Sequence, residues 1–84
     1  MNYDKVMEVI KTIVMDVCEL EEKKLQNPEA RFAEDLGVDS MAALEIVSKI
    51  EKTLRLPIPE ERIPDMRSLK DVCDLVLKLA EEKV

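Results

Sequence analysis

Hydrophobic residues recur at three- and four-residue steps in three stretches of this 84-residue chain. The first stretch runs from Tyr3 or Asp4 to Cys18 or slightly beyond, the second runs from Ser40 to about Leu54, and the third begins near Ser68. This period places apolar side chains on one face of a helix, so each stretch predicts an amphipathic α-helix. The expected buried stripes are, in chain order, Val6, Ile10, Ile13, Val17 and Leu20; Ala43, Ile46, Val47, Ile50 and Leu54; and Leu69, Val72, Cys73, Val76, Leu79 and Ala80.

The segment 25–39 is predicted as a long loop, because Pro28 removes a backbone donor and restricts the residue before it. A loop of this length is uncommon in a small domain and usually has a function. The charged run at residues 21–24 favours a helix and can extend the first helix by one turn. The expected apolar anchors of the loop are Leu25, Phe32 and Leu36.

Three of the four prolines fall within residues 55–67, which excludes long regular structure there. A short third helix of one or two turns is expected around Glu60 to Ile63, with Pro59 at its first position and Pro64 ending it early. The pattern as a whole predicts an all-α fold. It contains three long helices, one short third helix, and a long loop between the first two helices.

The composition describes a small domain with an aliphatic core. Apolar residues make up 46% of the chain but aromatic residues only 2%, so Val, Ile, Leu and Met must fill the interior. We expect residues 1–84 to form a single domain, which at this size buries about 60–65% of the surface of the unfolded chain.

The net charge of −6 comes from 19 acidic and 13 basic residues. An acidic surface repels nucleic-acid phosphates and anionic lipid, so we expect neither nucleic acid nor membrane as a partner. It instead favours partner proteins with basic patches. The start of the chain lacks the pattern of a signal peptide, and no stretch has the length and hydropathy of a transmembrane helix. We therefore expect a cytoplasmic monomer.

Histidine is absent and the two cysteines, Cys18 and Cys73, lie far apart in the sequence. We expect both to be reduced thiols beside apolar positions, in preference to a disulfide. This set offers no metal site and no nucleophile–base pair that uses histidine. The sequence therefore predicts a protein that is not an enzyme.

The stretch 34–45 contains the only glycine, Gly37, followed by Ser40 where the loop becomes a helix. Asp39 and Ser40 are both good N-cap residues. The free amides and the dipole of a helix N-terminus favour an attached anion, so a phosphate ester on Ser40 would be well placed. On the dipeptide alone, the favoured interpretation of Ser40 is a simple cap. Gly37 is expected to supply a positive φ or close packing before the helix.

The string Asp35-Leu36-Gly37-Val38-Asp39-Ser40-Met41, followed by Leu44-Glu45, resembles the phosphopantetheine attachment site of acyl carrier proteins. The resemblance continues through Ile58-Pro59-Glu60 and through residues 68–72, and it covers nearly the whole chain. It implies a four-helix carrier fold in which Ser40 covalently bears 4′-phosphopantetheine, placed there by a phosphopantetheinyl transferase. The arm would hold acyl intermediates as thioesters for fatty-acid or polyketide-type biosynthesis.

The resemblance also implies that the second helix is recognised by acyl-transferring and synthase enzymes with basic docking patches. Ala42, Lys49 and Lys52 depart from the more acidic members of the family along this helix. The alternative is that Met41 and Leu44 only widen the core stripe. The expected docking residues are Met41, Leu44, Glu45, Ser48 and Glu51.

Family members can shelter the acyl chain inside the bundle. Ile63 stands where a small residue is often found, so we expect a tighter pocket than in typical fatty-acid carriers. The alternative is a simply packed core. The positions that resemble the pocket are Phe32, Leu36, Val47, Ile50, Ile63, Met66 and Val72.

Two other functions are compatible with the sequence. An aminoacyl or peptidyl carrier protein, including a D-alanyl carrier, shares the same attachment chemistry. A helical interaction domain that carries nothing would use Ser40 only as a cap. Covalent modification of Ser40 separates the second alternative from a carrier.

Overall fold

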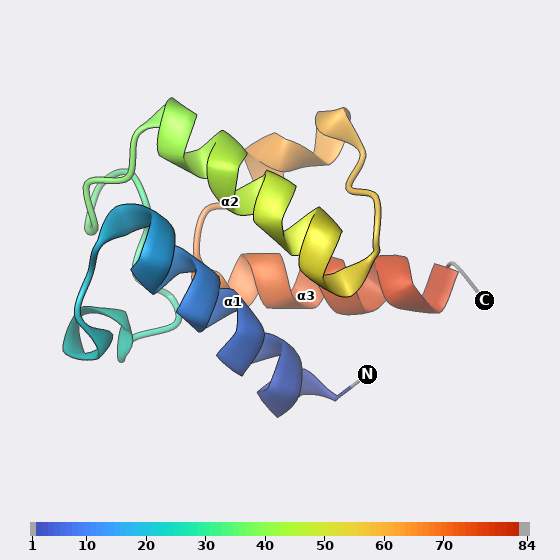
Figure 1. The fold of residues 1–84 in the computed structure, drawn as a ribbon, viewed down its shortest axis with the longest axis horizontal. Helices are drawn as coiled ribbons and strands as arrows, with labels where there is room; N and C mark the ends of the chain where they lie inside the picture. Colours follow the sequence, from blue (N-terminus) through green and yellow to red (C-terminus); the bar gives the residue numbers. More distant parts are fainter. Residues whose placement is uncertain (1, 83–84) are drawn as a thin grey trace.

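The structure, a computed structural model, describes residues 2–82, and in this range it is helical with no strand. The long helices are α1 (Tyr3–Cys18), α2 (Ser40–Leu54) and α3 (Leu69–Glu82), and two short 3₁₀ helices are η1 (Glu22–Leu25) and η2 (Glu60–Asp65). The predicted all-α fold, with a short helix before the last long one and a long first loop, is confirmed. In Figure 1, α2 runs back beside α1, and α1 packs against both α2 and α3.

The start of α1 is capped by Asn2, whose side-chain oxygen accepts a hydrogen bond from the amide of Lys5 at 3.1 Å. The helix ends at Glu19, which adopts a left-handed conformation with φ of 52°. The charged run 21–24 therefore does not extend α1, and that expectation was wrong. Most of this run belongs to η1 instead. This short helix places Leu25 in the core, where only 1% of its surface is exposed.

The short third helix is longer than predicted, because η2 continues through Pro64 to Asp65. Pro59 precedes the helix as its cap rather than occupying its first position. Pro64 lacks an amide hydrogen, but it stands near the C-terminal end, and the amide of Met66 still donates to the carbonyl of Ile63 at 3.0 Å. The helix therefore lacks one backbone hydrogen-bond donor at Pro64 but does not end there.

The core is one aliphatic cluster to which all three long helices contribute. Within the predicted stripes, Val17, Leu20, Ala43, Leu54, Leu79 and Ala80 are half-buried and the other members are buried. Val38, Leu56 and Ile58 are buried loop residues that the helical pattern did not reveal. No described helix is long and apolar enough to span a membrane.

The loop between η1 and α2 is held by backbone hydrogen bonds to the start of α3. The amide of Phe32 donates to the carbonyl of Arg67 at 2.8 Å, and the amide of Lys70 donates to the carbonyl of Pro28 at 2.9 Å. Arg31 and Ser68 form an isolated antiparallel bridge. Phe32 is buried and Leu36 is half-buried. The loop is therefore pinned to a distant segment just before it delivers the chain to α2.

Candidate functional site

Ser40 is the first residue of α2, and Asp39 before it is the N-cap. The Asp39 side chain accepts a hydrogen bond from the amide of Ala42 at 2.8 Å, and its carbonyl accepts one from the amide of Ala43 at 3.0 Å. Of the two candidate caps, Asp39 performs this role. The hydroxyl of Ser40 is exposed and forms no hydrogen bond with any residue in the described range.

Gly37 lies in the turn that leads to Asp39 and has φ of +69°. A Cβ atom at this position would meet no atom within 4 Å, so glycine is favoured here for its backbone conformation and not for close packing. The next residue, Val38, is buried, and its amide donates to the carbonyl of Phe32 at 2.7 Å. The turn thus has a defined shape that fixes where α2 begins.

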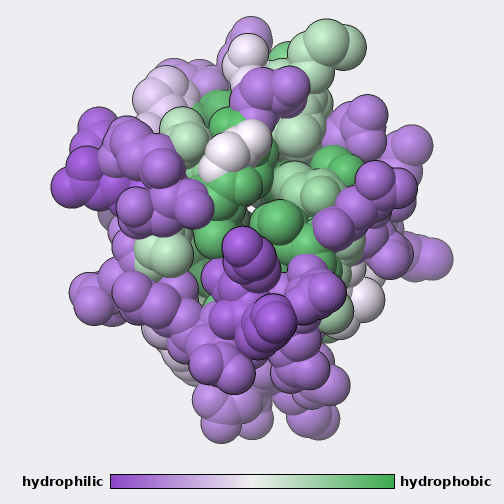
Figure 2. All heavy atoms as spheres, turned by 90° about the vertical axis from the view of Figure 1, so that its left-hand side faces the viewer, coloured by the Kyte–Doolittle hydropathy of each residue, from purple (hydrophilic) through white to green (hydrophobic). Residues whose placement is uncertain are grey.

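Beside Ser40, α2 presents large apolar side chains to solvent. Met41 is 76% exposed and Leu44 is 56% exposed, so neither belongs to the core stripe. Glu45 and Ser48 are also exposed. Figure 2 shows the face that lies at the left of Figure 1, where hydrophobic side chains gather centrally and hydrophilic ones surround them.

Glu51 differs from the other predicted docking residues. It is half-buried, and its carboxylate accepts a hydrogen bond from the amide of Ile58 at 2.9 Å. This bond ties the end of α2 to the extended segment that follows it. The structure therefore gives Glu51 a role in holding that segment, which sequence reasoning did not foresee.

A small apolar cavity of about 30 Å³ lies inside the bundle. That volume is about that of one or two water molecules and cannot contain an acyl chain without rearrangement. Of the predicted pocket residues, Leu36 and Ile50 are not in its lining: Ile50 is fully buried and Leu36 lies in the loop near the surface. The cavity is lined by Phe32, Ala43, Ile46, Val47, Ile63, Met66 and Val72, of which Ala43 and Ile46 were not predicted.

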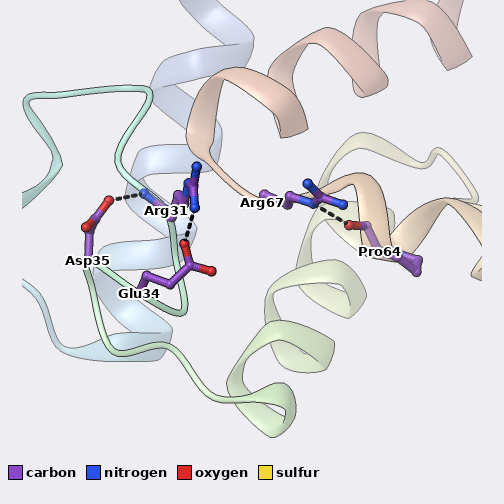
Figure 3. A network of polar contacts seen from close by, with 5 residues as sticks. All are labelled: Arg31, Glu34, Asp35, Pro64 and Arg67. Carbon is purple, nitrogen blue, oxygen red and sulfur yellow. Dashed lines mark hydrogen bonds and ion pairs between the residues drawn. The ribbon is translucent and has the colours of Figure 1, made fainter.

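A second, open depression of about 250 Å³ is lined by Ser40 itself and by two arginines, Arg31 and Arg67. Sequence reasoning missed both arginines. Arg31 pairs with Glu34 through an Nη1–Oε2 distance of 2.7 Å, whereas the Nε of Arg67 donates to the carbonyl of Pro64 at 3.4 Å (Figure 3). The Arg31 pKa is raised, mainly by this hydrogen bond to Glu34. Only the folding of residues 31–34 against 66–67 brings these groups beside the serine.

Carboxylates also lie near this site, on the α1 side. The Cys18 thiol is half-buried, and its pKa is raised by burial first and then by the charges of Asp39 and Glu45. Both cysteines are free thiols. The helix end that carries Ser40 therefore has both carboxylates and arginines as neighbours.

The site has what a phosphate ester needs. The Ser40 hydroxyl is accessible, the first turn of α2 contains no acidic residue, and Arg31 and Arg67 line the adjacent depression together with Glu34 and Asp39. The amides at the start of a helix stabilise an attached anion. Ser40 is thus a fitting attachment point for a phosphate-linked prosthetic group.

Comparison with known proteins agrees with this geometry. The model of a family described as the phosphopantetheine attachment site matches residues 8–76. The acyl carrier protein of Thermosynechococcus vestitus is 34% identical over 76 residues, which cover 90% of this chain and 93% of that protein. The acyl carrier protein of Rickettsia bellii is 33% identical over 81 residues, which cover 94% of this chain and 91% of that protein. The chain therefore belongs to the acyl carrier protein family, whose shared domain is the attachment site for phosphopantetheine.

Proposed function

We propose that Ser40 covalently bears 4′-phosphopantetheine and that the protein carries acyl intermediates in fatty-acid or polyketide-type biosynthesis. One observation carries the assignment of the serine. Asp39 makes the capping hydrogen bond, so the exposed hydroxyl of Ser40 has no structural role to give up when it is modified. This argues against the alternative in which Ser40 serves only as a helix cap.

Attachment requires a phosphopantetheinyl transferase. The Ser40 oxygen forms a bond to the phosphorus next to the pantetheine group, and the diphosphate bond of coenzyme A breaks to release its adenosine bisphosphate part. We assign the general base that takes the serine proton to the transferase. When attached, the group supplies a terminal thiol that holds acyl groups as thioesters. This chain positions the attachment point and raises the effective concentration of the cargo at each docked enzyme.

We further propose that partner enzymes dock on the exposed residues beside Ser40. Met41 and Leu44 offer apolar contact area, and Glu45 offers a negative charge to basic patches on the partner. Ser48 lies one turn after Leu44 and is exposed as well. We assign Glu51 a supporting part, through the segment that its carboxylate holds.

The cargo is proposed to be an acyl group rather than an aminoacyl or peptidyl group, because both relatives are named acyl carrier proteins. The interior cavity of about 30 Å³ would leave most of a long acyl chain outside the bundle. Loading with a long acyl chain should therefore leave the NMR methyl signals of Val47, Ile63 and Val72 nearly unshifted. Large shifts of these signals would show that the chain enters the core.

The attachment is tested by intact-mass measurement before and after incubation with coenzyme A and a promiscuous phosphopantetheinyl transferase. We expect the wild type to gain one phosphopantetheine and Ser40→Ala to gain none. Ser48→Ala is the matched control, since it removes another exposed serine of the same helix and should still be modified. A folded, initially unmodified wild type that gains no mass would contradict the proposal and favour a non-carrier interaction domain.

A further inference from the structure

The depression beside Ser40 adjoins the interior cavity. It lies where the start of α2 meets the loop residues 31–34 and the segment 66–67. Phe32, Ala43 and Met66 line both the depression and the cavity, so the two spaces share a wall of apolar side chains. Because Ser40 also lines the depression, a group attached to its oxygen starts within this space.

The two arginines of the depression are engaged differently. Arg31 forms an ion pair with Glu34, so its charge is largely compensated. Arg67 forms no ion pair with any residue in the range 2–82. Its Nε donates to the carbonyl of Pro64, which steadies the side chain without compensating its charge. Arg67 is therefore the uncompensated positive charge at this site.

A phosphodiester on Ser40 would carry one negative charge close to acidic groups. Asp39 is the preceding residue and lines the same depression, and Glu34, which is paired with Arg31, lines it as well. Each carboxylate raises the energy of a nearby phosphate, and the amides of the first turn offset only part of this repulsion. An arginine at the same depression can offset more of it, because guanidinium groups match phosphate oxygens in geometry.

We infer that Arg67 holds the phosphodiester of the attached arm in the depression beside Ser40, with Phe32, Ala43 and Met66 against the dimethyl carbon that follows the phosphate. This inference rests on the proposed function, namely that Ser40 bears phosphopantetheine. Arg67 is a positioning residue, because it orients the base of the arm and touches neither the thiol nor the cargo. The arm thereby leaves the protein in a preferred direction instead of sampling all directions.

The test compares unmodified and modified forms of three proteins: wild type, Arg67→Gln and Arg31→Gln. Both variants lose one positive charge at the same depression, so Arg31→Gln controls for net charge. For each protein, the melting temperature of the unmodified form is subtracted from that of the modified form. This subtraction removes any effect of the substitution on folding itself.

We expect this change in melting temperature on modification to be about 2–5 °C lower in Arg67→Gln than in the wild type. A partly exposed ion pair in a small domain implies an effect of this size. Arg31→Gln should lose less than Arg67→Gln, because the charge that it removes is already paired with Glu34, and both effects should shrink at high salt. In NMR spectra of the wild type, the Nε–H signal of Arg67 should shift on modification and that of Arg31 should not.

Equal changes in the two variants would mean that only the general charge acts, and this would overturn the inference. Equal differences in all three proteins, with no shift of the Arg67 signal, would overturn it as well. Intact mass separates these results from a failure of the proposed function. If Ser40 gains no phosphopantetheine at all, the carrier assignment fails, whereas modification without any role of Arg67 removes only this inference.

Discussion

Two regions of the molecule differ in how they use apolar residues. In the α1–α3 pair, Ile10, Val72, Cys73 and Val76 have no exposed surface. We define the serine corner as residues 37–44 with Phe32, Met66 and Arg67. There Met41 and Leu44 face solvent, and charged side chains lie beside them. The first region supplies stability through burial, whereas the second forgoes burial to keep Ser40 and its surroundings accessible.

The two cysteines reflect the same difference. The Cys73 thiol is buried and donates a hydrogen bond to the carbonyl of Tyr3 at 3.6 Å. Its pKa is raised to about 11, mainly by burial. Cys18 is half-buried, and its pKa is raised first by burial and then by the charges of Asp39, in the serine corner, and of Glu45, next to it. Cys73 thus belongs to a dry interior and Cys18 to the border of a charged surface.

The largest loss of stability is expected for Ile10→Ala, because the Ile10 side chain has no exposed surface. Removing this side chain should lower the free energy of unfolding by about 2–5 kcal/mol, because the transfer free energy is lost and a cavity remains. Urea unfolding followed by circular dichroism measures it. Val9→Ala, at the half-buried neighbouring position, is the control and should cost less. Equal costs would contradict the contrast between the regions.

The next largest effect is a loss of stability at alkaline pH. The Cys73 thiol ionises at about 11 in the folded protein, raised from an ordinary pKa of 9.0, so the unfolded chain loses this proton first as pH rises. Its contribution to stability is complete below pH 9 and is lost between pH 9 and 11, amounting to about 2–3 kcal/mol.

Unfolding free energies across this pH range measure the Cys73 effect. The variant Cys73→Ala removes the titrating group, so its stability should fall less steeply between pH 9 and 11 than that of the wild type. Identical slopes would show that the thiol is not protected by burial. Cys18→Ala serves as the comparison from the border of the serine corner, and it should reduce the slope less than Cys73→Ala, because Cys18 is only half-buried.

A smaller effect, confined to binding, is expected for Leu44→Ala. Leu44 is 56% exposed, so the free energy of unfolding should change by no more than about 0.5 kcal/mol. If the serine corner is a docking surface, KM of the transferase should rise by about fivefold, or about 1 kcal/mol. Thr53→Ala, at the far end of the same helix, should change neither quantity. Unchanged KM in Leu44→Ala would remove Leu44 from the docking surface.

An effect of similar size, but on stability, is expected for Gly37→Ala. The backbone at Gly37 has φ of +69°, and the added methyl group would meet no neighbour within 4 Å. The cost is therefore conformational only, about 1 kcal/mol of unfolding free energy. Gly37→Asn should cost less, since asparagine tolerates this conformation better. If both substitutions are neutral in urea unfolding, the turn before Ser40 is not held in this shape.

Much of this fold was predictable because helical side chains three and four residues apart share one face. That rule placed all three long helices, and the Asp39-Ser40 pair indicated where α2 begins. The burial of loop residues was harder to predict, because Val38, Leu56 and Ile58 are not part of any helical stripe. The end of α1 at Cys18 was predicted, but its possible extension through residues 21–24 does not occur, since Glu19 adopts a left-handed conformation although it is not a glycine.

The sequence by itself determined the helical class, the family and the serine at the start of α2, since all of these depend on residues close together in the chain. Only the tertiary structure decided that Arg67 lies beside Ser40 and which residues line the small cavity. It also decided that the Glu51 carboxylate accepts a hydrogen bond from the Ile58 amide. Each of these depends on a contact across a loop or between elements. The physical reason is that hydrophobic periodicity reports which face of a helix is buried, but not which distant segment covers that face.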